Sequence, residues 1–269
     1  MLKAAAQKIE KKYKFGIHAL FYAAILYSHI EGYFTFPDTF YYIIIVPITA
    51  ASVILVHYPN ITIKNFVMAA LLPVVLAYGG TLSLLLFPNV SLIFKLTAVA
   101  VFAFLDYVVL LIDNIFLVVE GREELIPLYR VAVTWSLIIQ IVVLIPLVSS
   151  VYKFNINSYY QALAVGVISF LYTIYQIWVS RYDKDAKDTG VVERVFLSLI
   201  VFFVVTASVA GVSFIPSEPF LKALFTATVA MFGLSYISAY LKNEINKKFI
   251  FQYTTIILFF LVLMLIFRP

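Results

Sequence analysis

The chain has 269 residues, of which 64% are hydrophobic and only 12% are charged. An ordinary soluble domain is about 45–50% apolar and about 25% charged, so this composition excludes a soluble globular protein and predicts a polytopic integral membrane protein. The net charge of +5 is modest, and with no soluble basic domain we expect no binding to nucleic acid. Cysteine is absent, which excludes disulfides, thiolate metal sites and cysteine nucleophiles.

The chain begins with a basic segment, 1–14, in which five lysines accompany a single glutamate. We predict that this segment is a cytoplasmic leader to a single transmembrane helical domain, 15–269. The apolar stretch after the leader has no small-residue cleavage site, which favours a first membrane span over 15–31 rather than a signal peptide. The alternative for this stretch is an amphipathic helix lying on the membrane surface.

Eight further apolar runs of about 20 residues predict transmembrane helices, because each run is long enough to cross a bilayer and is bounded by polar or proline-containing breaks. These runs lie at 39–57, 65–87, 92–119, 128–151, 158–180, 195–215, 219–240 and 249–267. With the first span included, the predicted fold is all-α with about nine transmembrane helices joined by short loops.

The distribution of basic residues tests this topology, because cytoplasmic loops of membrane proteins carry an excess of Lys and Arg. With nine spans, all 19 Lys and Arg residues fall on the side of the N-terminus except Lys95, Lys153, Lys222 and Arg268. This asymmetry predicts a cytoplasmic N-terminus and a C-terminus outside.

The predicted span at 92–119 contains acidic residues within an otherwise apolar run. At about 100° per helical residue, Asp113 lies roughly 20° from Asp106, Glu120 roughly 40° and Lys95 roughly 20°. A carboxylate at mid-membrane costs about 2.5–3.5 kcal/mol, so we expect this face to point into the protein. The acids are candidates for steps of a proton or cation path, or for the acid/base groups of an embedded enzyme. The alternative is that a hydroxyl, a tyrosine or Arg130 holds each acid and that the acids only fix helix packing.

The turn after this span leads to Arg130, which could fold back and pair with Glu120 or Asp113 in a guanidinium–carboxylate fork. The alternative, which we prefer, is an ordinary charged turn in which Arg130 reaches the lipid headgroups.

The hairpin that contains Arg130 also resembles part of a known protein family. The sequences NIF at 114–116 and IPLYRVA at 126–132 resemble a segment of an uncharacterised family of multi-spanning bacterial membrane proteins. Because that family has no assigned activity, the resemblance implies no catalytic residue and only a bacterial plasma membrane, the inner or cytoplasmic one.

No motif for cofactor or metal chemistry is present in the sequence. The three histidines, His18, His29 and His57, do not share a helical face at the spacing of metal ligands, so we predict neither a metal site nor a cofactor. The patterns GxxxxGK[ST], HExxH and GxSxG do not occur, and their absence leads us to lean against an enzyme.

Three functions of different classes remain open, of which we prefer the first. The first is a structural or accessory subunit of a membrane assembly, in contact with the lipid bilayer and with other membrane proteins. The second is a small transporter or proton-coupled carrier that uses Asp106 and Asp113. The third is a membrane-embedded enzyme for a lipid or lipid-linked substrate, which would use the same acids with Arg130 and needs a lateral opening toward lipid.

Overall fold

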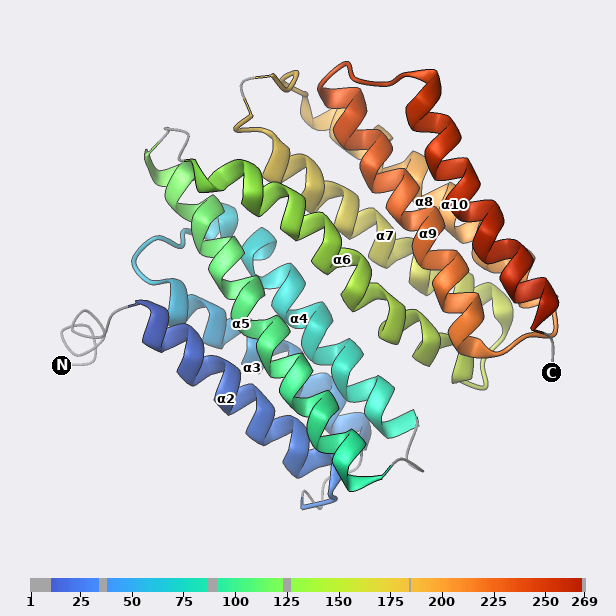
Figure 1. Cartoon of the computed structure of the whole chain (residues 1–269). Coiled ribbons are helices and arrows are strands. Elements are labelled where there is room, and N and C mark those ends of the chain that lie inside the picture. Colours follow the sequence, from blue (N-terminus) through green and yellow to red (C-terminus); the bar gives the residue numbers. More distant parts are fainter. Residues whose placement is uncertain (1–10, 34–37, 87–90, 123–126, 184, 268–269) are drawn as a thin grey trace. The chain divides into compact units, whose positions relative to one another are not determined.

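A computed structural model describes residues 11–33, 38–86, 91–122, 127–183 and 185–267, and the side chains of all of these except 38–42 and 122. Over these residues the protein is all-α (Figure 1). Its helices are α2 (Lys11–Ile30), α3 (Asp38–His57), α4 (Ile63–Leu86), α5 (Leu92–Arg122), α6 (Leu128–Lys153), α7 (Ser158–Ser180), α8 (Val191–Ser213), α9 (Pro219–Leu241) and α10 (Lys247–Ile266). Each predicted span corresponds to one of these helices, so the helical fold class is confirmed.

Seven of the helices in the described part of the chain, α4 to α10, are long and apolar enough to cross a membrane. The other two fall outside this set. Helix α2 begins with Lys11, Lys12 and Lys14, and the apolar stretch described in α3 is the shorter Ile43–His57. A multi-spanning membrane protein is therefore supported by seven helices, while nine crossings and the orientation of the termini stay predictions.

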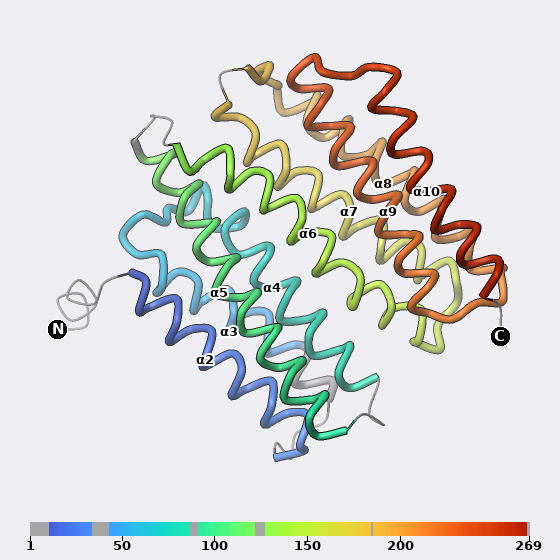
Figure 2. The backbone as a smooth tube through the Cα atoms, in the orientation of Figure 1, coloured from blue at the N-terminus to red at the C-terminus, as the bar shows by residue number. Residues whose placement is uncertain are grey.

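The chain divides into two compact units, Met1–Ala132 and Val133–Pro269, which we call unit 1 and unit 2. They follow each other along the sequence, from blue to green and from green to red (Figure 2). The boundary falls in the first turn and a half of α6. Each unit is described by itself below.

In unit 1, helix α2 packs on α5, and α4 packs on both α3 and α5. Gly80 of α4 makes this packing close, because a Cβ atom there would lie 2.5 Å from the Tyr22 hydroxyl and 3.2 Å from the Phe102 ring. The Tyr22 hydroxyl donates to the Leu76 carbonyl at 3.3 Å. Tyr22 lies about one turn after His18 on α2, so these contacts hold the same face of α2 against α4 and α5.

In unit 2, helix α7 packs most extensively on α8, and α9 packs on α7, α8 and α10. Gly166 faces Thr206 and Phe202 of α8, while Gly233 faces Val201 of the same helix. Small residues let helix backbones approach closely where there is no hydrophobic force between spans. Helix α10 contacts α9 and buries little of its own surface, so most of it is available to lipid.

Candidate functional site

The centre of unit 1 contains a hydrogen-bonded chain of Asp106, His18 and Ser52. His18 Nδ1 lies 2.7 Å from Asp106 Oδ2, and His18 Nε2 lies 2.7 Å from Ser52 Oγ. Asp106 is 2% exposed and His18 is 7% exposed, so bulk water does not compete for the contact between them, whereas Ser52 is only half-buried. The chain connects three helices, since Asp106 belongs to α5, His18 to α2 and Ser52 to α3.

The sequence of α2 explains why His18 points inward. The buried residues of this helix are Phe15, His18, Ala19, Tyr22, Leu26 and His29, which recur at steps of three and four and define one helical face. His18 is therefore part of the face that packs on α5 and not of the outer face. On α5, Asp106 lies between the buried residues Phe102 and Val109 and points toward that face.

The positions of the protons on Asp106, His18 and Ser52 follow from the Thr49 carbonyl, which accepts the last hydrogen bond of the series. The Ser52 hydroxyl donates to the Thr49 carbonyl at 2.7 Å, and a hydroxyl has only one proton to give. With that proton on the Thr49 side, His18 Nε2 is the donor to Ser52 Oγ. The contact between Nδ1 and Oδ2 then needs a proton of its own, because two acceptors at 2.7 Å would repel. In this arrangement His18 and Asp106 together carry two protons and are neutral overall.

In a second arrangement, His18 and Asp106 together carry one proton instead of two. His18 then carries its proton on Nδ1 and donates it to the Asp106 carboxylate, while Nε2 accepts from the Ser52 hydroxyl, which has to leave the Thr49 carbonyl. This state has a net charge of −1 at a buried position, which is costly in a low-dielectric environment. The two states differ in one proton and in the direction of the Ser52 hydroxyl.

An open groove of about 350 Å³ leads to His18 and Ser52 between α2 and α3. Its walls are almost entirely apolar, and Ile17, Phe21 and Leu55 on these walls are more than half exposed. Lys14 also lines it. These exposed apolar side chains make the groove suited to an apolar ligand.

Asp113 and Glu120, the other two predicted acids of α5, have different surroundings from Asp106 and from each other. Asp113 is fully buried, about 10 Å along the helix axis from Asp106. Glu120 Oε2 accepts a hydrogen bond from Asn65 Nδ2 at 3.1 Å, while Asn65 Oδ1 accepts from the Thr62 backbone N–H at 2.7 Å at the start of α4. Between these acids, Asn114 accepts from Lys11 Nζ at 3.1 Å.

Lys95 and Arg130, the basic residues predicted for the site, lie away from the Asp106 contact. Lys95 Nζ pairs with Glu31 Oε1 at 3.2 Å just beyond the end of α2, about 16 Å along α5 from Asp106. Arg130 is exposed in the first turn of α6, next to Tyr129, whose ring packs on Phe116. The roles predicted for Lys95, Arg130 and the three acids stay predictions.

His18, Ser52 and His57 were not among the residues predicted for the site. His57 is completely buried, neither ring nitrogen has a hydrogen-bond partner within the described residues, and its ring packs on Phe15 with centroids 5.6 Å apart. A signal for His18 was present in the sequence, because any titratable residue in an apolar run is a functional candidate. The spacing of the histidines gives no indication of this contact, since the partner of His18 is a carboxylate on another helix.

Metal binding has no support among the described residues, where no group of three or more His, Asp or Glu side chains is arranged to hold an ion. No family model, no curated protein and no solved structure matches this chain. The resemblance of the 114–132 hairpin is thus not accompanied by an identified family. Fold and composition define the class of the protein as a multi-spanning helical membrane protein.

Proposed function

We propose that this protein is a proton-coupled carrier and that the His18–Asp106 pair binds the coupling proton. The observation that carries the proposal is that both nitrogens of a buried imidazole are engaged, one by a buried carboxylate and the other by a hydroxyl that has an alternative acceptor. Such a group can gain or lose one proton without losing either contact. The proposal includes the predicted setting, a bacterial cytoplasmic membrane with the N-terminus inside.

A purely structural role explains this arrangement less well. Buried ion pairs and buried titratable pairs contribute little net stability compared with apolar side chains of similar volume. Ionisable residues inside a membrane domain are rare and cluster on proton and substrate paths. Asp113, Lys11 with Asn114, and Glu120 with Asn65 continue the polar side chains of the same region toward one end of α5. These groups supply successive positions for a proton between the pair and the membrane interface.

Loss of the proton provides a means of coupling to helix movement. In the deprotonated state the Ser52 hydroxyl turns from the Thr49 carbonyl of its own helix to the imidazole of α2. The bond within α3 is thereby lost, while the bond between α2 and α3 is kept with its direction reversed. These helices form the groove that leads to His18 and Ser52, so proton binding and the width of the groove are linked through one hydroxyl group.

Proton flux in liposomes tests the proposal. The full chain is reconstituted with an entrapped pH-sensitive dye, and proton uptake is driven by an imposed pH gradient with the membrane potential clamped. We expect uptake well above that of empty liposomes for the wild type and for Asp188→Asn, a control acid whose side chain is 98% exposed. Asp106→Asn and His18→Gln should reduce uptake at least tenfold. Equal flux in the wild type and Asp106→Asn, or no flux in any sample, would contradict the proposal.

Proton binding is also measurable without a cargo. The ¹⁵N spectrum of the imidazoles, with His18 assigned by the signal missing from His18→Gln, reports which ring nitrogens carry protons. We expect the His18 signals to change with the pH of the medium in the wild type and to lose this change in Asp106→Asn. A His18 ring whose protonation never responds to pH would identify a fixed structural contact, which agrees with the accessory-subunit prediction.

A second candidate function is favoured by one specific observation. Ser52, His18 and Asp106 are connected through the atoms used by serine hydrolases, with Nε2 on the hydroxyl and Nδ1 on the carboxylate, and the groove is open to apolar ligands. We rank this embedded lipid hydrolase second for two reasons. The Ser52 proton is engaged by Thr49, and Ser52 lies inside α3, where backbone N–H groups are bonded within the helix and do not form an oxyanion hole. Covalent labelling of Ser52 by a fluorophosphonate, lost in His18→Gln, would reverse this ranking.

A further inference from the structure

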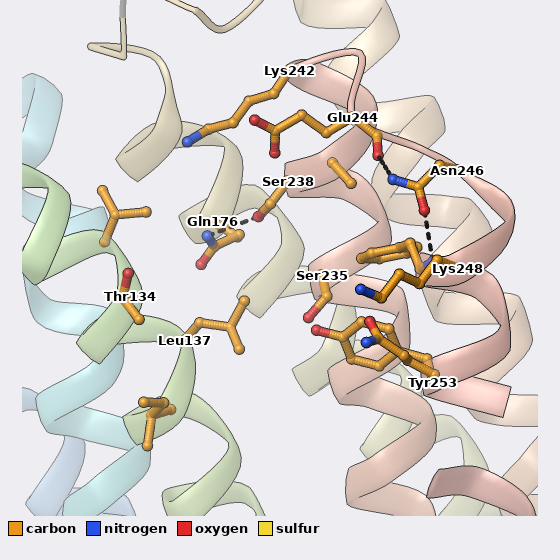
Figure 3. A pocket seen from close by; sticks show the side chains of 15 residues that line it. Thr134, Leu137, Gln176, Ser235, Ser238, Lys242, Glu244, Asn246, Lys248 and Tyr253 are labelled. Carbon is orange, nitrogen blue, oxygen red and sulfur yellow. Dashed lines mark hydrogen bonds between the residues drawn. The ribbon is translucent and has the colours of Figure 1, made fainter. Parts of the chain in front are cut away.

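Unit 2 contains a larger pocket that the proposed function does not use. It has a volume of about 710 Å³ and is lined by residues of α6, α7, α9 and α10 and of the turn between α9 and α10. Figure 3 shows Glu244, Lys248 and Ser235 directed into the space between α6 and the pair α9 and α10. The pocket lies near the start of α6, the end of α7, the end of α9 and the start of α10. Four helix ends at one level place it at a membrane interface.

The charged residues that line the pocket differ in whether they have a partner. Lys242 is neutralised by Asp183, with Nζ 2.6 Å from Oδ2. Lys248 and Glu244 also line the pocket, and both are exposed. Neither side chain has an ion-pair or hydrogen-bond partner within the part of the chain that the structure describes. The pocket thus offers one positive and one negative group to a ligand.

Hydrogen bonds hold the turn and the helix ends that carry these two charges. Asn246 Oδ1 accepts from the Phe249 N–H at 2.8 Å, which caps the start of α10, and Asn246 Nδ2 donates to the Glu244 carbonyl at 3.3 Å (Figure 3). On the other side of the pocket, Gln176 of α7 donates to Ser238 of α9 at 3.0 Å. The loop before α8 is held as well, since the Lys187 N–H donates to the Leu241 carbonyl. The Lys187 side chain donates to Glu193, a bond that raises the pKa of Lys187.

The lining of the pocket also contains a buried hydroxyl and several apolar side chains. Ser235 is 6% exposed and its hydroxyl has no hydrogen-bond partner within the described residues. A buried donor without a partner is unfavourable, and a ligand oxygen that reached this hydroxyl would remove the cost. Leu137, Ile138 and Phe249 supply apolar surface beside it, and α10 leaves most of its outer surface to lipid.

We propose that this pocket binds the headgroup of a zwitterionic aminophospholipid of the phosphatidylethanolamine type. The phosphate accepts from Lys248 and Ser235, the ammonium donates to Glu244, and an acyl chain follows the apolar wall toward the bilayer. Basic pockets between transmembrane helices select anionic headgroups, but here Glu244 would repel a ligand that carries only negative charge. A quaternary ammonium has no N–H to donate, so phosphatidylcholine satisfies Glu244 less well.

Lipid titrations of the purified full chain in detergent test the proposal. A ligand that binds the folded protein raises the melting temperature with its concentration, which gives a dissociation constant for each lipid. We expect phosphatidylethanolamine to bind at least tenfold more tightly than phosphatidylglycerol, phosphatidylcholine or free phosphoethanolamine. Tight binding of free phosphoethanolamine would show a soluble ligand instead of a lipid, and equal binding of phosphatidylglycerol or phosphatidylcholine would overturn the role of Glu244.

Charge variants distinguish a specific pocket from general attraction to lipid. Lys248→Gln should weaken phosphatidylethanolamine binding about tenfold, because it removes a charge-assisted hydrogen bond to the phosphate. The matched control is Lys247→Gln, the neighbouring residue that does not line the pocket, and it should change binding less than twofold. Glu244→Gln should shift preference toward phosphatidylglycerol. Equal losses in the two lysine variants would contradict the proposal.

Ser235→Ala provides a variant that should fold normally, since the hydroxyl it removes has no partner without a ligand. We expect an unchanged melting temperature in the absence of lipid and several-fold weaker binding of phosphatidylethanolamine. Unchanged binding would remove Ser235 from the site and overturn the proposed position of the phosphate.

Discussion

His18 and His57 show how different the surroundings of two buried imidazoles can be in one unit. Both nitrogens of His18 are engaged, whereas neither nitrogen of His57 has a partner within the described residues. Removal of His18 leaves the Asp106 carboxylate buried without that partner, which is strongly destabilising. Removal of His57 takes away two unsatisfied polar atoms and costs only packing against Phe15.

Leucine substitutions of His18 and of His57 should therefore change the stability of the protein in opposite directions. We expect His18→Leu to lower the free energy of unfolding by about 3–5 kcal/mol and His57→Leu to raise it by about 1–2 kcal/mol. Unfolding of both variants and the wild type in the same detergent, followed by circular dichroism, measures the difference. A clear loss of stability in His57→Leu would mean that its nitrogens are bound by water or by residues outside the described part of the chain.

At the level of single residues, the sequence predicted one half of the central contact. Asp106 was visible because a carboxylate in an apolar run is conspicuous. Its partner was not, since His18 lies 88 positions earlier in the chain and the contact depends on how α2 is rotated against α5. The sequence also does not show that Lys95 pairs with Glu31, because a shared helical face does not imply a shared partner.

At the level of helices, predictions were most accurate where an apolar run ends at a polar break. The first span was predicted to begin at 15, whereas the described part of α2 already includes Lys11, which donates to Asn114. Helix α5 is longer than predicted at its end and reaches Arg122. Charged residues at a helix end extend it beyond the hydrocarbon layer, and hydropathy alone does not detect this extension.

Helix packing in unit 1 is tested at Gly80. A Cβ atom there would lie 2.5 Å from the Tyr22 hydroxyl, so Gly80→Ala should separate α2 from α4 and lower the free energy of unfolding by about 1–3 kcal/mol. Gly121→Ala is the matched control, because no described residue lies within 4 Å of its added methyl group and alanine favours a helix. Thermal unfolding compares the two, and equal stability would show that Tyr22 moves aside without cost.

For the whole molecule, composition was sufficient to establish the membrane class, because no soluble core of this length has so few charges. Division into two units was not predicted, since the boundary lies inside α6 and no linker marks it. The central contact of unit 1 lies within residues 18–106, and the pocket of unit 2 within residues 133–253. The two proposed activities can therefore be disrupted separately, and a variant of one should leave the other intact.

The polar residues of α2, among them Lys11, Lys12, Lys14 and His18, have a consequence for the order of biosynthesis. Alone, α2 is not apolar enough to count as a span, and its partner helix α5 emerges from the ribosome about 80 residues later. We expect the nascent α2 to remain at the membrane surface until α5 supplies Asp106 for His18 and Asn114 for Lys11. Translation of chains truncated after α3 and after α5, with a glycosylation acceptor placed behind α2, measures this. Glycosylation should be poor in the shorter chain, efficient in the longer one and reduced again by Asp106→Leu, whereas full glycosylation of the shorter chain would show that α2 inserts unaided.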